Sequence, residues 1–125
     1  MIHADHFKEV NDRYGHPVGD EVLRRVGRVL LDQVRDGSAV YRYGGEEFCV
    51  ILRDVTLLTA CSVADRLRSS VALTRMPTAE PVTISLGVAH GASDALDTVI
   101  RHADSTLDEA KRAGRDTVRG FTAAA

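Results

Sequence analysis

A pair of glycines between two strand-like runs is the sequence feature that most constrains the fold. Residues 40–43 precede Gly44 and Gly45, and the apolar run 48–52 follows them. Glycine reaches positive φ without a Cβ clash, so a two-glycine connection between strands predicts a tight β-hairpin. The continuous apolar character of residues 48–52 predicts a strand that is buried on both faces.

Two adjacent carboxylates, Glu46 and Glu47, follow the glycines where the hairpin is expected to be most exposed. Paired carboxylates at such a turn suit a divalent cation and a phosphate ester. Taken alone, the turn favours the simpler interpretation of ordinary solvated surface charge, because short motifs recur by chance.

Composition limits the classes of protein that remain. A chain of 125 residues, 44% hydrophobic and 27% charged, is typical of one globular domain. Its net charge of −2 gives no general attraction to nucleic acid or to an anionic membrane, so neither is expected as a partner. There is no apolar run long enough to span a bilayer and no secretory signal. Cys49 and Cys61 are expected to be small buried hydrophobes in a reducing cytoplasm.

Periodicity and breaker residues predict the remaining elements. Residues 15–19 carry two glycines and a proline and are expected to separate two helices, with Asp20 leading or capping the second. The expected elements are helices over 7–14, 20–34, 57–73 and 96–113, a strand over 82–88, a short edge strand over 117–119 and a frayed tail over 121–125. This order predicts an α+β sandwich in which helices pack on a mostly antiparallel central sheet.

Four separated segments then resemble one family. They are Arg-Tyr-Gly-Gly-Glu-Glu-Phe at 42–48, the matches at 5–12, 14–16 and 19–20, the strand 82–89, and the helix end at 103–104 and 109–115. Together they are similar to the GGDEF domain of diguanylate cyclases, in its Glu-bearing variant. The resemblance implies a fold related to nucleotidyl cyclases and polymerase palms. It assigns residues 1–120 to this domain, without its N-terminal helix and most of its first strand.

The resemblance also implies a reaction. Two GTP molecules condense into cyclic di-GMP, each held by one of two facing domains, so a homodimer with a second GGDEF domain is expected. The 3′-hydroxyl of each substrate attacks the α-phosphate of the other, and two pyrophosphates leave. Mg²⁺ or Mn²⁺ is the implied cofactor.

Residue roles follow from the same resemblance. The metal set is Glu46, His3, Ala4 and Glu47. Glu46 is also a candidate for activating the 3′-hydroxyl, and Glu47 for holding a second metal or orienting the turn. Gly44 and Gly45 leave room for phosphate to approach the backbone. These four residues of the turn form the implied catalytic set.

The implied substrate-binding residues lie on both sides of the hairpin in sequence. Asn11 and Asp20 resemble the family's guanine readers, and Phe7 and Lys8 match the turn that binds the β- and γ-phosphates. Lys111 and Arg115, four residues apart, match its terminal-phosphate clamps; judged without the resemblance, both would be assigned to complementing a helix dipole.

Three departures separate this chain from the family pattern. His3 stands where the family has the first Asp of Asp-x-Asp, so a weaker affinity for Mg²⁺ is expected. Most of the first strand is absent, so either residues 1–5 form a stub strand, or another copy fills the gap, or the protein is longer, and dimerisation or reduced stability is expected. The family's product-inhibition pair, Arg-x-x-Asp, is here Arg35 with Ser38, so weak or no inhibition by cyclic di-GMP is expected. The alternative function is a catalytically inactive GGDEF module that binds GTP or a protein partner.

Overall fold

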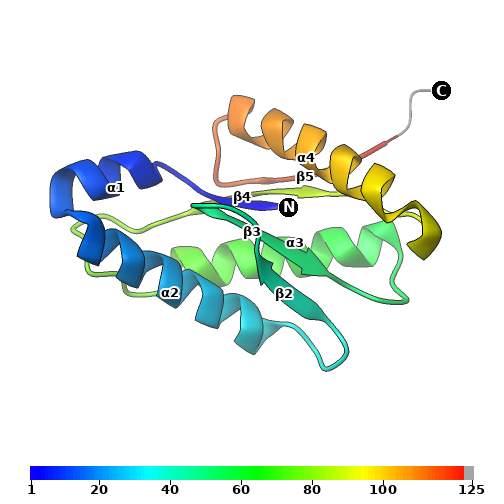
Figure 1. Ribbon diagram of the computed structural model, residues 1–125, viewed down its shortest axis with the longest axis horizontal. Coiled ribbons are helices and arrows are strands. Elements are labelled where there is room, and N and C mark those ends of the chain that lie inside the picture. The colour runs from blue at the N-terminus through cyan, green and yellow to red at the C-terminus, as the bar shows by residue number, and fades with distance from the viewer. Residues whose placement is uncertain (123–125) are drawn as a thin grey trace.

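The computed structural model describes residues 1–122, which form one sheet with helices on both of its faces (Figure 1). In chain order the elements are β1 (Ile2–Ala4), α1 (Phe7–Tyr14), α2 (His16–Gln33), β2 (Ala39–Arg42), β3 (Glu47–Ile51), α3 (Leu57–Ala72), β4 (Ile84–Val88), the 3₁₀ turn η1 (Ser93–Ala95), α4 (Leu96–Arg112) and β5 (Val118–Gly120).

The sheet confirms the predicted fold class. Its strand order is β2-β3-β1-β4-β5, antiparallel throughout except that β5 runs parallel to β4. The short strand β1 lies at the centre, where Ile2 pairs with Phe48 of β3 and with Leu86 of β4. The N-terminal residues therefore do form a stub strand, which has three residues.

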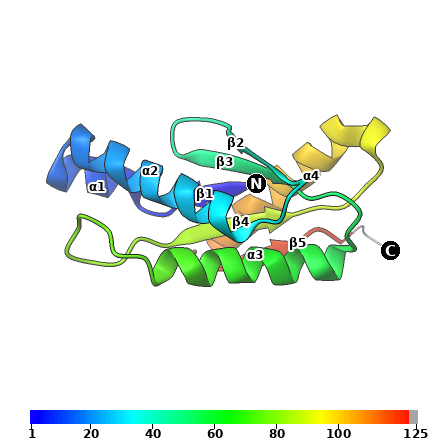
Figure 2. The same ribbon diagram turned by 90° about the horizontal axis from the view of Figure 1, so that it is seen from below.

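The helices divide between the two faces of the sheet. Buried side chains of β1 and β4, such as Ile2 and Leu86, pack with those of α2 and α3 in the larger core cluster. On the other face α4 crosses β4 so closely that a Cβ on Gly87 would lie 2.2 Å from the carbonyl oxygen of Ala103. Figure 2 shows α3 and α4 on opposite sides of the sheet.

Local signals explain most element boundaries. Thr56 caps α3 by accepting a hydrogen bond from the Thr59 N–H. The prediction for the second helix was wrong at its start, because α2 begins at His16 and not near Asp20. Only Gly15, with φ of 91°, breaks the chain, and Pro17 fits the first turn of a helix, where no intrahelical N–H donor is needed. Asp20 is therefore a helical residue and not an N-cap.

Two further expectations need correction. Strand β3 is not buried on both faces, since Phe48 alone is buried and residues 49–51 are half-buried. Phe121, assigned to the frayed tail, donates its N–H to the Val88 carbonyl at 2.7 Å and stacks on His102 with ring centroids 3.9 Å apart. Residues 123–125 of that tail lie outside the described residues. Cys49 and Cys61 are free thiols and only half-buried.

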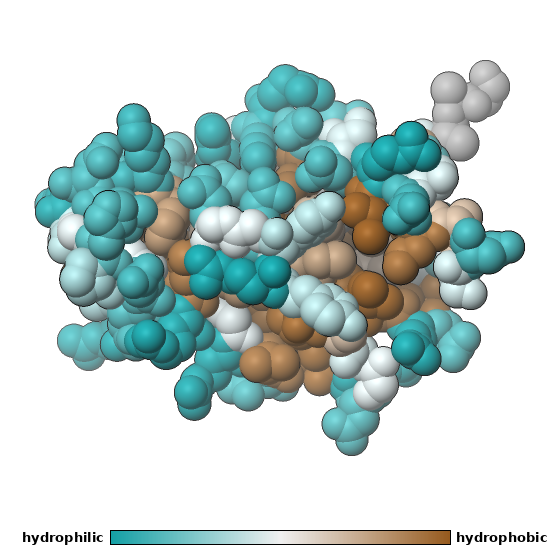
Figure 3. Space-filling view, in the orientation of Figure 1, coloured by the Kyte–Doolittle hydropathy of each residue, from teal (hydrophilic) through white to brown (hydrophobic). Residues whose placement is uncertain are grey.

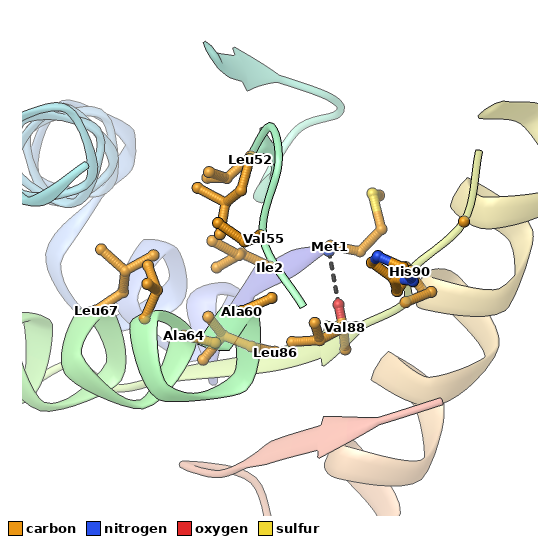
Figure 4. Close-up of a pocket in the computed structure, with 16 residues that line it drawn as sticks. Met1, Ile2, Leu52, Val55, Ala60, Ala64, Leu67, Leu86, Val88 and His90 are labelled. Atoms are coloured by element: carbon orange, nitrogen blue, oxygen red, sulfur yellow. Dashed lines mark hydrogen bonds between the residues drawn. The ribbon is translucent and has the colours of Figure 1, made fainter. Parts of the chain in front are cut away.

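An apolar cavity with a volume of about 130 Å³ lies beside Met1, between the segment that follows β3 and the segment that follows β4. Figure 4 shows Leu52 and Val55 on one side of Met1 and Val88 and His90 on the other. In Figure 3, hydrophobic surface also gathers between α4 and the β2–β3 hairpin, over the part of the sheet that no helix covers. None of the helices in residues 1–122 combines the length and hydropathy that a bilayer span requires.

Candidate functional site

The closest contact between predicted site residues joins β1 to the glycine turn. His3 Nε2 lies 2.8 Å from Glu46 Oε1, within hydrogen-bond distance. The backbones meet at the same place, since Ala4 donates its N–H to the Glu46 carbonyl at 3.0 Å. His3 pairs with Glu47 across β1 and β3, so these two side chains stand on one face of the sheet. All four predicted metal residues, His3, Ala4, Glu46 and Glu47, are thus neighbours.

The ionisation of His3 reflects the carboxylates around it. Asp5 Oδ1 lies 3.8 Å from His3 Nδ1, which is too long for a hydrogen bond but close enough for charge attraction. The Asp5 carboxylate, followed by that of Glu46, raises the pKa of His3 above its usual value against the opposing effects of burial and of the Lys111 charge. The Asp116 N–H, in the turn after α4, donates to Asp5 Oδ2 at 3.1 Å, which places the C-terminal end of α4 near His3.

Asp5 itself is buried, with 3% of the residue exposed. Its carboxylate accepts hydrogen bonds from Ser85 Oγ at 2.6 Å, from Thr83 Oγ1 at 2.7 Å and from the Asp116 N–H at 3.1 Å. Burial raises the pKa of Asp5, but His3 and these three donors outweigh it and hold the pKa below its usual value. Asp5 is therefore a buried anion that joins three segments of the chain.

The glycine turn differs from the expected tight hairpin. Residues 43–46 form a four-residue connection between β2 and β3, and neither Gly44 nor Gly45 has a left-handed φ. A Cβ on Gly44 would meet only Glu47 at 3.9 Å, and one on Gly45 would meet nothing within 4 Å. The two glycines therefore leave open space at the surface, which agrees with the prediction that a ligand approaches the backbone here.

Arg42 is a site residue that the sequence analysis missed. Its Nε donates to the Gly44 carbonyl at 3.0 Å and to the Gly45 carbonyl at 3.2 Å, and its Nη2 also bonds to Gly45. The guanidinium lies 5.9 Å from the ring centroid of Phe48. Arg42 thus braces the turn, and its position at the end of a strand beside two glycines was the available signal.

A groove with a volume of about 680 Å³ runs between α2 and the β2–β3 hairpin. Apolar groups of Leu23, Gly27 and Phe48 lie in it, and Asp20 stands at its edge. Its other lining residues are Arg24, Arg28, Leu31, Asp32 and Arg42. Gly27, in the middle of α2, was the sequence signal for this groove.

The other predicted guanine reader lies on the neighbouring helix. Asn11 Oδ1 is buried and has no hydrogen-bond partner among the described residues. It leans over Gly19, where an added Cβ would lie 1.9 Å from it. Phe7 also packs against Gly19, whereas Lys8 is exposed on the first turn of α1. The contact between α1 and α2 therefore brings Asn11 beside Gly19, the residue before Asp20.

The predicted inhibitory pair lies away from this cluster. Ser38 precedes β2 at the end opposite to the glycine turn, and Arg35 donates to the Arg53 carbonyl at 2.9 Å. Ala4 is fully buried and has no ligand atom in its side chain, so only its carbonyl oxygen could reach a cation. Arg115 follows α4 in a turn with positive φ, next to the Asp116 N–H that bonds to Asp5.

The available ligand atoms fit a divalent cation that is bound together with substrate phosphates better than a cation held by protein side chains alone. Within residues 1–122, no three His, Cys, Asp or Glu side chains are grouped as a protein-only metal site requires. His3 and Glu46 are bonded to each other, which leaves the remaining Glu46 oxygen and Glu47 as hard ligands. Mg²⁺ characteristically binds one or two carboxylates together with substrate phosphates.

Comparison with known proteins is consistent across sequence and structure. The family model described as diguanylate cyclase, GGDEF domain, matches residues 1–117. The chain is 41% identical over 119 residues to diguanylate cyclase DgcM of Escherichia coli K12, covering 94% of this chain and 29% of DgcM. It is 39% identical over 130 residues to response regulator PleD of Caulobacter vibrioides, with shares of 98% and 29%.

Solved structures share the fold. The active GGEEF domain of a diguanylate cyclase from Vibrio cholerae superposes with a TM-score of 0.90 at 30% identity, covering 98% of this chain and 81% of that one. The GGDEF domain of DgcB from Caulobacter crescentus, in complex with c-di-GMP, gives 0.85 at 32% identity, with shares of 95% and 72%. The chain spans less than a third of the length of the curated relatives it matches.

Proposed function

Because this chain belongs to the GGDEF domain family of diguanylate cyclases, we propose that it binds GTP and forms half of a site that makes cyclic di-GMP. The observation that carries the proposal is the convergence of Glu46, Glu47 and, through the contacts of Asp5 with His3 and with Asp116, the turn after α4 beside an open glycine turn. The carboxylates of Glu46 and Glu47 would bind a cation, and the basic residues at the end of α4 would bind phosphate. Both groups lie near the groove between α2 and the β2–β3 hairpin.

We propose that guanine enters the groove between α2 and the hairpin. The base would lie on the apolar surface of Leu23 and Phe48. Guanine N1–H and N2–H₂ are donors, and the carboxylate of Asp20 and the unpartnered Asn11 Oδ1 are acceptors. A partner for Asn11 Oδ1 would remove the cost of leaving a buried acceptor without a hydrogen bond.

The triphosphate would then extend over the glycine turn. Open space at Gly44 and Gly45 admits it, and Lys8, Lys111 and Arg115 supply positive charge. Mg²⁺ or Mn²⁺, when bound, neutralises phosphate charge in the transition state. Glu46 and Glu47 would hold that cation, and Glu46 would accept the proton of the attacking 3′-hydroxyl.

The reaction needs two such sites, because each GTP provides one nucleophile and one electrophile. We therefore propose a homodimer in which two glycine turns face each other, acting in the cytoplasm, where GTP is available. A single domain would bind the nucleotide without turning it over.

Replacement of Glu46 by Gln tests the proposed activity. The wild-type chain, incubated with GTP and Mg²⁺ or Mn²⁺, is expected to yield cyclic di-GMP by chromatography. Glu46→Gln keeps the side-chain shape but removes the charged ligand, so the rate is expected to fall by at least about 100-fold. Equal rates in wild type and Glu46→Gln would contradict the proposal.

Glu80→Gln is the matched control for this experiment. It makes the same chemical change at an exposed ion pair with Arg13, in the loop between α3 and β4 and outside the groove and the glycine turn. An exposed pair contributes little to stability, so this variant should fold and keep the wild-type rate.

The His3–Glu46 contact favours a second candidate function, a GTP-binding module without catalysis. The imidazole occupies one carboxylate oxygen and brings no negative charge for a cation. Thermal stabilisation by GTP without formation of product would select this candidate over the cyclase.

The pair Arg35 and Ser38 leads to a prediction about product inhibition. Because Ser38 has no negative charge and Arg35 is bonded to the Arg53 carbonyl, cyclic di-GMP is expected to bind there weakly. Calorimetry should show no submicromolar binding to the wild type, and Ser38→Asp should tighten it. Submicromolar binding that is lost on Arg35→Ala would overturn this prediction.

A further inference from the structure

The turn after α4 has an unusual backbone. Gly114, Arg115 and Asp116 have φ values of 111°, 65° and 45°, so three successive residues are left-handed and two of them carry side chains. Such a conformation is strained for residues with a Cβ and persists only where the surroundings hold it. The neighbouring bonds, from Gly114 N–H to Lys111 and from Arg115 N–H to Ala110, return to the helix itself.

Only the third residue of the turn is bonded to the sheet through its backbone. The Asp116 N–H donates to Asp5 Oδ2 at 3.1 Å, and Asp5 is anchored by Thr83 and Ser85 of the segment beside it. The Asp116 side chain accepts a bond from Arg68 at 3.1 Å, but both of these side chains reach solvent. The buried Asp5 carboxylate is thus the contact that the turn itself makes beside β1, and one residue later the Thr117 carbonyl accepts a hydrogen bond from the Leu86 N–H of β4 at 3.0 Å.

We propose that Asp5 is a positioning residue that holds the 114–116 turn, and through it Arg115, against the phosphate end of the nucleotide site. This inference rests on the proposed GTP binding. Asp5 stands two residues from His3 and directly after β1. The same short segment therefore carries His3, which contacts the proposed metal ligand Glu46, and Asp5, which holds the turn containing Arg115. A shift of the turn would move Arg115 and leave Asp20 and Asn11 in place, since these lie on α1 and α2.

Nucleotides with and without terminal phosphates test the inference. The probes are 3′-deoxy-GTP, which lacks the attacking hydroxyl and is not consumed, and GMP, which lacks the β- and γ-phosphates. Asp5→Ala is expected to weaken 3′-deoxy-GTP binding about tenfold, as for a lost charged hydrogen bond, and to leave GMP binding within about twofold. A merely structural role would weaken both nucleotides alike, which would overturn the proposal.

Three further variants sharpen the result. Thr78→Val makes a threonine-to-valine change in the loop between α3 and β4, where the hydroxyl bonds to the Glu80 carbonyl and not to Asp5, and should bind 3′-deoxy-GTP as the wild type does. Asp5→Asn, whose amide oxygen can still accept from Asp116, should restore most of the affinity. The double variant Asp5→Ala with Arg115→Ala should bind no more weakly than Arg115→Ala alone, because both changes act on one contact.

The outcomes separate the two proposals. If the wild type fails to bind 3′-deoxy-GTP, or Arg115→Ala has no effect, the proposed nucleotide site is wrong. If Arg115→Ala weakens binding and Asp5→Ala does not, only the positioning role is wrong. Should Asp5→Ala fail to fold, Asp5→Ser, which keeps a hydroxyl but is too short for the Asp116 N–H, replaces it with the same expected tenfold loss.

Discussion

Replacement of Gly87 by Ala is expected to destabilise the protein by about 3 kcal/mol, the upper part of the range for overpacking. The added Cβ would lie 2.2 Å from the Ala103 carbonyl oxygen and 2.3 Å from the Leu107 nitrogen, and both are backbone atoms of α4. A flexible side chain could move aside, but here the whole helix has to shift away from β4. Urea denaturation should show a lower midpoint with a similar slope.

Gly45→Ala is the matched control for this prediction. It adds the same methyl group where nothing lies within 4 Å, so a change within about 0.5 kcal/mol is expected. Equal urea midpoints for the two variants would show that α4 does not rest on β4 as closely as described.

His3→Asp is expected to make the stability of the protein depend on divalent cations. Without a cation, the introduced carboxylate would face that of Glu46, which lies 2.8 Å from His3 in the wild type, and would stand near Asp5. Two screened like charges about 4 Å apart repel by about 1 kcal/mol, so the variant should melt below the wild type in EDTA.

A divalent cation is expected to reverse the order of the two melting temperatures, so that His3→Asp melts above the wild type. Two facing carboxylates provide the hard oxygen ligands that Mg²⁺ prefers, so binding should offset the repulsion. At a cation concentration about 100 times Kd, the free energy of unfolding should rise by about 2.7 kcal/mol. Thermal melts in EDTA and in Mg²⁺ measure the difference, and adding Glu46→Gln to His3→Asp should abolish it. If Mg²⁺ does not change the melting temperature of His3→Asp, position 3 does not belong with Glu46 and Glu47 among the metal-binding positions.

Hydrophobic periodicity was sufficient to predict the order of helices and strands, because most of these elements are encoded by residues within their own segments. The helices predicted over 7–14, 57–73 and 96–113 all appear in the structure within one residue of those bounds. The start of α2 was mispredicted because Pro17 was interpreted as a breaker, although in the first turn of a helix it is favourable. The half-buried state of β3 depends on α4 covering only part of the sheet, which no local pattern encodes.

The candidate site was predictable only as far as the resemblance named its residues. It identified the glycine turn and His3, and the structure brings these together. It gave no role to Arg42, whose bonds to the Gly44 and Gly45 carbonyls depend on the four-residue form of the turn. The link from Asp5 to Asp116 joins residues 111 positions apart, and a three-dimensional contact of that separation leaves no trace in composition or periodicity.

The central place of β1 has a consequence during translation. Ile2 is made well before its partners Phe48 and Leu86, which follow 46 and 84 positions later. At about 5–20 residues per second, the ribosome needs roughly 4–17 s to supply the second partner. The β2–β3 hairpin and α2 can form in that interval, whereas the middle of the sheet has to wait. The edge that carries His3 and Glu46, with the turn at Arg115, is therefore completed only after residues 1–116 have been synthesised.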